Sequence, residues 1–414
     1  LSLNPSSLCT DLCYPCMAVS FLRREVSDLC LGKPALRSLP ISATVADALS
    51  ALKRSGENYV SVWSCEHSSR KKTDFDGDCR CVGKVCMVDV ICFLCREENL
   101  SRPSVALQSP VSDLLPKVPG LIRHLDPQSS LLEAIDYILE GAQNLVVPIE
   151  SYISLNSRKK LLNKPASFGC TLHNGREFCW LTQEDVIRFL LNSIGIFSPI
   201  PTFTIESLNI IDANVMTIYY NDPGTSALPS ISRALTEQTS IAVIDEDNKL
   251  IGEISPSTLT FCDETVAAAI TTLSAGDLMA YIDCGGPPED LVHSVKTRLE
   301  EKNLGAMLEL MEEFSLSALS SSSSSSSDEE FGSSRSWGSG RHSSVRRSEA
   351  IMCHPWSSLV AVMIQAITHR ASYAWVIEED FSLIGIVTFA GMLKVLRSIA
   401  GVWRRPEGEI SFKQ

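Results

Sequence analysis

The stretch VSDLCLGKPALRSLPISATVADALSALKRSGENYVSV (Val26–Val62) carries the local signals that decide the fold. The pair Ala43-Thr44 precedes a run whose apolar residues recur at helical spacing, at Val45, Ala48, Leu49 and Leu52. A hydroxyl side chain is favoured at a helix N-cap, and this spacing is typical of an amphipathic helix with one buried face. The β-rich run Tyr59–Trp63 follows at once. The stretch therefore predicts a short entry segment, a capped helix and a strand.

The same pattern returns later in the first half of the chain. The tetrapeptide VSDL recurs at Val111–Leu114, and IRHLDPQSSLLEAI (122–135) aligns with LRSLPISATVADAL (36–49), with Ser129-Ser130 at the cap. Two further blocks keep the register, apart from one insertion: NLVVP (144–148) on NYVSV (58–62), and DVIRFL (185–190) on DVICFL (89–94). Chance does not align three blocks in order, so this is an internal repeat. Each copy predicts the order β-α-β-β-α, with a final helix that starts near Asp89 or Asp185.

The second half of the chain repeats the pattern more faintly. Ile241–Ser255 aligns with Ala374–Thr388, and both predict a β-hairpin around an acidic turn. Helices are expected upstream at Ser226–Leu235 and Leu359–Thr368, and AGDLM (275–279) echoes VSDL a third time. AGDLM lies well before the last hairpin, which indicates that the fourth copy is interrupted. The interruption contains a pure serine run, so we expect a disordered insertion at 315–348.

Length, charge and composition narrow the functional class. The chain has 414 residues, of which 44% are hydrophobic, and its net charge is −13. An acidic chain is repelled by phosphate backbones, so no nucleic-acid partner is expected. No stretch approaches the roughly 20 apolar residues that span a bilayer, so no membrane partner is expected either. Fifteen cysteines in so long a chain, without a convincing signal peptide, indicate free thiols in the cytoplasm, with the nucleus as a second location.

The beginning of the chain lacks these patterns. A methionine first occurs at Met17, and residues 1–16 show neither helical nor strand periodicity. We expect residues 1–22 to form a disordered or non-native extension. Its Cys9, Cys13 and Cys16 match part of a metal-ligand set, but no second ligand pair lies nearby.

Four β-α-β-β-α copies resemble the cystathionine-β-synthase-type (CBS) domain, and the resemblance covers nearly all of residues 23–402. The stretch 26–62 is especially similar to plant proteins made of CBS domains alone. The resemblance implies an α+β fold in which copies pair into two Bateman modules, at 23–197 and 203–402. The expected copies are 23–98, 108–197, 203–265, and a split fourth copy at 272–314 and 349–402.

CBS modules bind adenosine compounds between paired copies, through a Gly-hydrophobic-x-Thr/Ser-x-x-Asp motif at the turn into the last helix. A carboxylate can accept hydrogen bonds from both ribose hydroxyls, while a hydroxyl and helix N-terminal amides can bind phosphate. The candidate ligand-binding residues are Asp89, Thr182, Asp185 and Thr388. The expected regulatory ligands are AMP, ADP, ATP or S-adenosylmethionine.

The four copies match this motif unequally. Copy 2 has both Thr182 and Asp185, so Asp185 is ranked first. Copy 1 keeps the acid, Asp89, but has Cys86 in place of the hydroxyl residue. Copies 3 and 4 keep the hydroxyl residue, Ser255 and Thr388, but have Thr258 and Gly391 in place of the acid. Thr182 and Asp185 also satisfy a capping box, which needs no ligand, so a helix cap alone remains the alternative to a nucleotide site.

Cysteines crowd the first copy. A zinc site could combine Cys65 and His67 with Cys79 and Cys81, but their spacing fits the usual paired ligands poorly. Cys92 and Cys95 could instead form a redox pair. Buried thiols that act as small hydrophobes explain these residues more simply, and no metal site is predicted. In the insertion, Ser327 and Ser344 are candidate phosphorylation sites because Glu330 follows the first and Arg341 precedes the second.

These features predict a non-enzymatic regulatory protein. The sequence contains no nucleophile–base–acid set, Walker loop, Rossmann fingerprint or HExxH motif. Four copies in one chain are similar to the γ regulatory subunits of AMP-activated-type kinases, which implies a protein partner such as a kinase complex. The modules could also support a homodimer. Two alternatives remain: a ligand-free interaction scaffold, and a redox regulator of the thioredoxin-acting kind found among plant CBS-only proteins.

Overall fold

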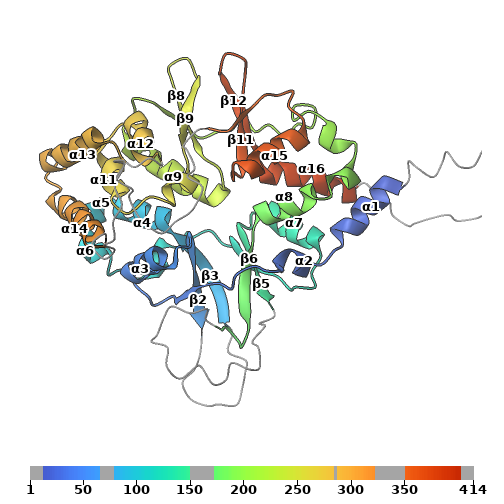
Figure 1. Ribbon diagram of the computed structural model, residues 1–414, viewed down its shortest axis with the longest axis horizontal. Coiled ribbons are helices and arrows are strands. Elements are labelled where there is room, and N and C mark those ends of the chain that lie inside the picture. The colour runs from blue at the N-terminus through green and yellow to red at the C-terminus, as the bar shows by residue number, and fades with distance from the viewer. Residues whose placement is uncertain (1–12, 66–78, 150–171, 284–286, 322–349, 402–414) are drawn as a thin grey trace, which may run out of the picture.

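The computed structural model describes residues 13–65, 79–149, 172–283, 287–321 and 350–401. These residues form four three-stranded sheets, each with one parallel and one antiparallel strand pair. Helices pack beside every sheet (Figure 1). The predicted α+β class with four β-α-β-β-α copies is confirmed.

The first two copies fill the first half of the chain. Copy 1 consists of β1 (Ser38–Pro40), α3 (Val45–Ser55), β2 (Tyr59–Cys65), β3 (Cys79–Cys86) and α4 (Met87–Leu94). Copy 2 consists of β4 (Ile122–His124), α7 (Leu131–Leu139), β5 (Asn144–Ile149), β6 (Glu177–Leu181) and α8 (Gln183–Leu191). The short helices before and between them are α1 (Cys13–Leu22), α2 (Ser27–Cys30), α5 (Glu97–Leu100), α6 (Pro103–Ala106) and η2 (Val111–Leu114).

The other two copies follow the short helices η4 (Ile194–Phe197) and η5 (Ile200–Thr202). Copy 3 consists of β7 (Thr217–Tyr219), η6 (Gly224–Ala227), α9 (Leu228–Glu237), β8 (Ile241–Ile244), β9 (Leu250–Ile254) and α10 (Pro256–Leu259). Helices α11 (Val266–Thr272), α12 (Ala275–Ile282), α13 (Glu289–Glu301) and α14 (Gly305–Ser321) come next. Copy 4 consists of β10 (Met352–Cys353), α15 (Leu359–Thr368), β11 (Tyr373–Ile377), β12 (Leu383–Thr388) and α16 (Phe389–Gly401).

The predicted helix caps are present. Thr44 and Asp47 form a capping box at the start of α3, with the Asp47 amide 3.1 Å from Thr44 Oγ1. Ser130 caps α7 by accepting from the Glu133 amide. Such caps contribute about 1 kcal/mol each because they satisfy amides that have no partner within the helix. At the other end of α3, Gly56 adopts the left-handed conformation, with φ of 66°, which terminates the helix.

The copies pair through their sheets into two modules. Trp63, Cys79 and Cys81 of copy 1 pack against Val146 of copy 2. In the same way, residues of β8 and β9 pack against those of β11 and β12. Figure 1 shows copies 1 and 2 in the lower half and copies 3 and 4 in the upper half; in each half the strands lie near the centre from left to right, with helices on both sides. The predicted pairing of consecutive copies into two modules is confirmed.

The helices join one module to the other. One hydrophobic cluster contains Ile91 of α4 together with Ile231 of α9, and so links copy 1 to copy 3. A second cluster contains Ile187 of α8 together with Val362 of α15, and so links copy 2 to copy 4. Because the burial of apolar surface is the main favourable term in association, the two modules form one continuous body.

Each entry segment docks on the partner copy of its module rather than on the copy that follows it. In the first module, the amide of Val26 donates to the carbonyl of Ser129 in copy 2 at 2.9 Å. Conversely, the amide of Val111 donates to the carbonyl of Ala43 in copy 1 at 2.7 Å. The two VSDL segments are therefore exchanged between the copies.

The second module repeats this exchange. The amide of Ile205, before copy 3, donates to Ser357 in copy 4 at 3.0 Å. The amide of Ala275, in the AGDLM segment, donates to Asp222 in copy 3 at 2.8 Å. The exchange ties the two copies of each module together through main-chain hydrogen bonds.

Two regions differ from the sequence-based expectation. Residues 13–22 are helical instead of forming part of a disordered extension: Phe21 and Leu22 of α1 are buried, because they complete the cluster around α7, α8 and α16. The split of the fourth copy also takes a different form: all strands of its sheet lie within 352–388, and the earlier part of the chain supplies its entry segment at Ala275 together with additional helices.

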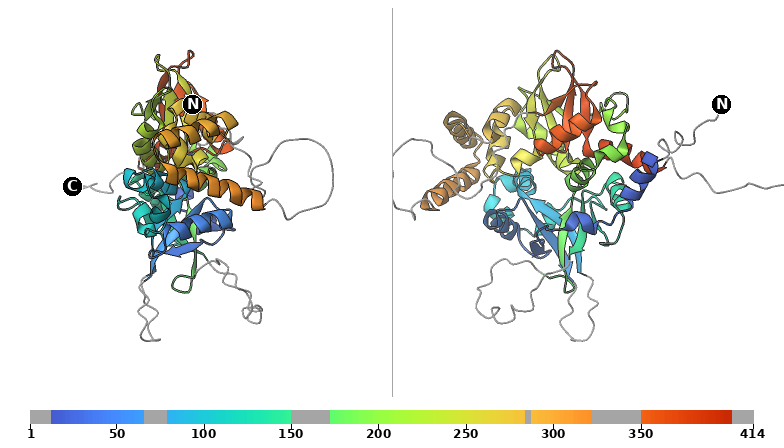
Figure 2. Two further views of the ribbon diagram at one scale, coloured as in Figure 1. Left: turned by 90° about the vertical axis from the view of Figure 1, so that its left-hand side faces the viewer. Right: turned by 45° about the vertical axis from the view of Figure 1, so that its right-hand side comes forward.

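The described residues between 275 and 321 form the helices α12, α13 and α14. Helix α12 docks on copy 3, and α13 and α14 pack against α11 and α6. Figures 1 and 2 show α13 and α14, in orange, on the outer side of copies 1 and 3. Helix α14 continues to Ser321, and so reaches into the expected insertion at 315–348, most of which lies outside the described residues.

Candidate functional site

The turn from the last strand into the last helix of copy 2 carries Thr182 and Asp185. Asp185 Oδ2 lies 2.8 Å from the Thr182 amide and 2.7 Å from Thr182 Oγ1, and the Asp185 amide donates back to that hydroxyl. Asp185 Oδ1 lies 2.7 Å from Lys33 Nζ, and the two side chains are only 26% and 21% exposed. Both carboxylate oxygens therefore already have partners within the chain, and the pair works as a helix cap.

The equivalent turn of copy 1 carries Asp89. Its Oδ2 accepts a hydrogen bond from the Cys86 amide at 2.8 Å, which is one half of a capping box. Burial raises the pKa of Asp89 to about 6, and the Cys86 amide and the charge of Lys84 oppose that rise only in part. Burial likewise lowers the pKa of Lys84. Copy 1 therefore places one acid and one base in a poorly solvated space.

Lys84 is held at the inner end of β3. Its Nζ lies 4.2 Å from the centroid of the Tyr59 ring and 3.4 Å from Asn144 Oδ1 of copy 2. Both contacts are compatible with a positive charge, because the ring face and the amide oxygen are electron-rich. Neither carries a negative charge; Asp89 supplies part of the opposite charge and partly offsets the lowering of the Lys84 pKa by burial.

The two turns of the second module lack an acid and are partly filled by neighbouring side chains. In copy 3, the Ser255 hydroxyl lies 3.1 Å from the Tyr373 hydroxyl of copy 4. Buried Glu253 accepts hydrogen bonds from Tyr373 and from Trp375 Nε1, at 2.9 and 2.7 Å. In copy 4, Thr388 caps α16 by accepting from the Gly391 amide at 3.2 Å. The polar groups of copy 3 have partners across the interface, and Thr388 has one within its own turn, so neither requires a ligand.

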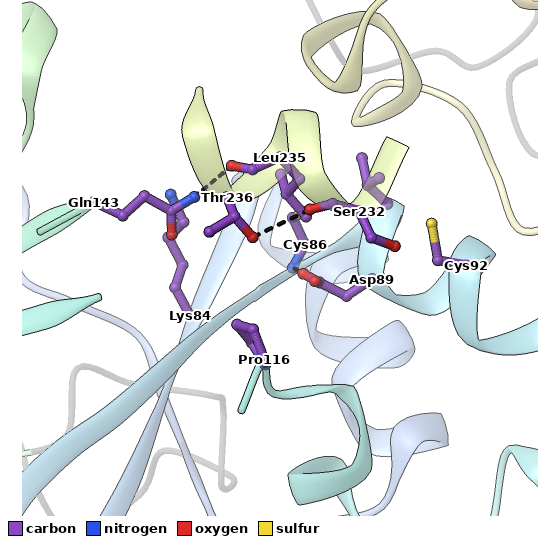
Figure 3. A pocket seen from close by; sticks show the side chains of 10 residues that line it. Lys84, Cys86, Asp89, Cys92, Pro116, Gln143, Ser232, Leu235 and Thr236 are labelled. Atoms are coloured by element: carbon purple, nitrogen blue, oxygen red, sulfur yellow. Dashed lines mark hydrogen bonds between the residues drawn. The ribbon is translucent and has the colours of Figure 1, made fainter. Parts of the chain in front are cut away.

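A cavity of about 100 Å³ lies beside Asp89 (Figure 3). The cavity lies where three copies meet. Copy 1 contributes β3 and α4, copy 2 contributes Pro116 after η2 and Gln143 before β5, and copy 3 contributes α9. Its lining residues are Lys84, Cys86, Val88, Asp89, Cys92, Pro116, Gln143, Ser232, Leu235 and Thr236. Of the four residues predicted to bind a ligand, only Asp89 lines this cavity.

The cavity wall is held by hydrogen bonds between the modules. Gln143 Nε2 of copy 2 donates to the carbonyl of Leu235 on α9 at 2.6 Å, and Gln238 Nε2 donates to the carbonyl of Gln143 at 2.7 Å. In Figure 3, Ser232, Leu235 and Thr236 approach the cavity from α9 while Pro116 lies on the other side. A group bound between them would contact both modules at once.

The sequence did not identify most of these lining residues. Lys84 lies two residues before Cys86 in β3 and was not part of the motif, while Gln143 and Ser232 come from other copies. The sequence did identify Asp89 through the motif, and Asp89 lines the cavity. The partners across the cleft depend on how the modules pack, which no local pattern encodes.

Two pairs of cysteines in copy 1 have different surroundings. Burial raises the pKa of Cys92 to about 12 and that of Cys95 well above its usual value, so neither thiol is ionised at neutral pH as a redox nucleophile would be. Cys65 and Cys79 lie together with His173 of copy 2, and their ligand atoms are all within 4.8 Å of one another. His67, Cys9, Ser327 and Ser344 lie outside the described residues, as do the side chains of Cys13 and Cys16.

Among the helices that the structure describes, none has the length and hydrophobicity that crossing a lipid bilayer requires.

Comparisons with known proteins identify relatives along nearly the whole chain. No family model matches it. The chain is 48% identical to the CBS domain-containing protein CBSX5 of Arabidopsis thaliana, over 92% of this chain and 98% of that protein. It is 28% identical to CBSX6 of the same plant, over 91% of this chain and 94% of that protein. It is 22% identical to the SNF1-related protein kinase regulatory subunit gamma-like PV42b, also of Arabidopsis thaliana, over 90% of this chain and 94% of that protein.

A solved structure shares the fold. Protein MJ1225 from Methanocaldococcus jannaschii matches with a TM-score of 0.50 and 14% sequence identity, over 90% of this chain and 99% of that one. At this identity the match concerns the arrangement of the four copies and not the chemistry of their clefts.

Proposed function

The chain belongs to the CBS-domain-containing proteins, and from this premise we propose that it is a non-catalytic regulatory protein that binds an adenine nucleotide in the cleft beside Asp89. The observation that carries the proposal is the cavity itself, which brings Asp89 and Lys84 of copy 1 together with side chains of copies 2 and 3. The carboxylate would accept from ribose hydroxyls, and the ammonium group would pair with phosphate.

Asp89 replaces Asp185 as the leading candidate because their surroundings differ. Asp185 has Lys33 and Thr182 as partners for its two oxygens. Asp89 lines a cavity and has a raised pKa, which means that the fold leaves its charge incompletely stabilised. A ligand that donates hydrogen bonds to it would supply the missing stabilisation.

The size of the cavity suggests how binding would act on the rest of the molecule. Ligand pockets usually measure about 300–1,000 Å³, which is larger than the 100 Å³ present here. A whole nucleotide would therefore require α9 to move away from α4. A ligand that fits only the opened cleft shifts the population toward the open arrangement of the modules, and a partner could sense that shift.

Titration calorimetry of the full chain with AMP, ADP, ATP and S-adenosylmethionine tests this proposal. Asp89→Asn keeps the size and one acceptor oxygen but loses charge-assisted hydrogen bonds worth roughly 1.5–3 kcal/mol, so affinity should fall about 10- to 150-fold. Asp185→Asn is the matched control and should change affinity less than about threefold. A larger loss in Asp185→Asn than in Asp89→Asn would contradict the choice of cleft.

The proposed partner is a protein kinase of the SNF1-related class, in a cytoplasmic or nuclear complex. Similarity to PV42b, whose name gives it as a gamma-like regulatory subunit of such a kinase, supports this partner. Co-purification of the full chain with the catalytic and scaffold subunits of that kinase tests it. Failure to associate in the presence and absence of nucleotide would reject the kinase partner and leave nucleotide binding to be judged by calorimetry.

A second function, a ligand-free interaction scaffold, is favoured by the state of the other clefts. Asp185 is paired with Lys33, and Ser255 is paired with Tyr373, so these clefts need no ligand. Absence of calorimetric heat with every adenosine compound at millimolar concentration would favour the scaffold over the sensor.

A further inference from the structure

We propose that Cys65, Cys79 and His173 form a zinc-binding site that joins copies 1 and 2 at the ends of strands β2 and β3. The three residues provide two sulfur atoms and one imidazole nitrogen, all within 4.8 Å of one another. Zinc in proteins prefers this set of ligands, with Zn–S bonds of about 2.3 Å and Zn–N bonds of about 2.0–2.1 Å. Ligand atoms at such bond lengths from one ion lie within about 4 Å of one another, so small movements would complete the site.

The two cysteines are paired by strand register. Cys65 is the last residue of β2 and Cys79 the first of β3, and they stand directly opposite each other in the antiparallel ladder. Directly opposite residues in such a ladder have Cβ atoms about 4.5–5.5 Å apart, which allows both thiols to reach one ion. Cys79 is buried, whereas Cys65 is exposed, so the site lies at the surface end of the hairpin.

His173 is oriented as a metal ligand would be. Its Nδ1 lies 3.3 Å from Cys65 Sγ, and its Nε2 lies 3.1 Å from Ser38 Oγ. The ring stacks on Trp63 at a centroid distance of 3.6 Å and an interplanar angle of 5°. In the tautomer with its proton on Nε2, the ring donates to the Ser38 hydroxyl and the Nδ1 lone pair faces the thiols, which is the arrangement that second-shell partners give to zinc-bound histidines.

A metal ion bound to these three residues would link copy 1 to copy 2. His173 belongs to copy 2, where a bridge to Arg176 precedes β6, while both cysteines belong to copy 1. A zinc ion would therefore connect the two copies of the first module at the edge where β2, β3, β5 and β6 converge (Figure 1). Three protein ligands leave one position of a tetrahedral site for solvent.

Binding has a defined proton balance. The Zn²⁺ ion replaces the protons of the Cys65 and Cys79 thiols, and two protons pass to the solvent for each ion bound. The neutral imidazole donates its Nδ1 lone pair and keeps its Nε2 proton.

Zinc titration of the reduced full chain tests the proposal. The chain is freed of metal, kept under argon, and titrated with Zn²⁺ against a chromophoric chelator, with calorimetry in two buffers to count released protons. We expect one tight ion per chain and about two protons released per ion near neutral pH. Co²⁺ in place of Zn²⁺ should give the charge-transfer absorption of a metal thiolate.

Four variants identify the ligands, with circular dichroism to confirm that each is folded. Cys65→Ser and His173→Gln should each weaken zinc binding at least 100-fold, since even second-shell changes cost about 10- to 100-fold. Ser38→Ala should weaken it by that smaller factor, and Cys262→Ser, a partly buried cysteine of copy 3, should leave it unchanged. Equal zinc affinity in Cys65→Ser and the unmodified chain, or release of no protons, would overturn the site.

Discussion

Lys33 joins the entry segment of the chain to the last helix of copy 2, because its ammonium nitrogen lies 2.7 Å from Oδ1 of Asp185. The same carboxylate caps α8 through Thr182. The ion pair therefore uses the acid that would otherwise face the cleft of copy 2, and it also fastens the exchanged entry segment to its partner copy.

A double-mutant cycle on Lys33→Met and Asp185→Asn should measure this connection. The pair is about a quarter exposed, so we expect a coupling free energy of about 0.2–1 kcal/mol in urea unfolding. The exposed Glu184–Arg188 pair on the same helix provides the reference cycle. A coupling free energy of zero for Lys33 and Asp185 would show that the two charges act independently.

Because the entry segments are exchanged, a substitution in one segment should destabilise the partner copy and not the copy that follows the segment. Val26 and Val111 are both fully buried, so replacing either by alanine should lower the free energy of unfolding by about 1–3 kcal/mol. In hydrogen exchange, Val26→Ala should speed exchange at α7 of copy 2, and Val111→Ala should speed it at α3 of copy 1. The reverse assignment would mean that each segment supports its own copy.

The raised pKa of Asp89 predicts a pH-dependent stability. A carboxyl group with a pKa of about 6 in the folded chain, against about 4 when unfolded, binds more protons in the folded state between those values. Stability should therefore fall as the pH rises from about 4 to about 6. The Asp89→Asn variant has no carboxyl group that titrates in this interval. The difference between its melting temperature and that of the unmodified chain should therefore grow in favour of the variant from about pH 4 to about pH 6, and should be constant above about pH 6. A difference that does not vary with pH would show that the carboxyl group is well solvated.

The filled interface of the second module can be tested at Tyr373. Its hydroxyl donates to Glu253, a carboxylate that is only 6% exposed. Tyr373→Phe removes this donor from a buried charge and should lower the free energy of unfolding by about 1–3 kcal/mol. Tyr219→Phe removes a hydroxyl from an exposed side chain and should stay within about 0.5 kcal/mol. Equal effects would contradict the role given to Glu253.

Much of the fold followed from local patterns. Thr44, Ser130 and the apolar spacing after them predicted the helices, and the aligned hairpins predicted the second module. The segment around Ile205 was missed as the fourth entry segment, because it shares only an apolar residue and a leucine three positions later with VSDL. The exchange itself was not predictable, since main-chain hydrogen bonds between copies leave no trace in side-chain periodicity.

The sites were harder to predict because they depend on distant residues. Asp185 ranked above Asp89 on motif completeness, yet Lys33 approaches the first and a cavity lies beside the second. His173 lies 108 residues from Cys65 and was not considered as its neighbour. The available signal was the Asn174-Gly175 pair, which favours a tight turn. Such a turn places His173 opposite Arg176, next to the start of β6.

Hydrogen exchange of the full chain with and without AMP tests the central claim most directly, because it locates the ligand and reports its effect on both modules. A nucleotide in the cleft beside Asp89 should slow exchange in α4 of copy 1 and change it in α9 of copy 3 at the same time. At an AMP concentration just sufficient to saturate the unmodified chain, Asp89→Asn should strongly reduce both changes, while Asp185→Asn should preserve them. Changes confined to α8 of copy 2, or no change at a concentration that saturates calorimetric binding, would contradict the account.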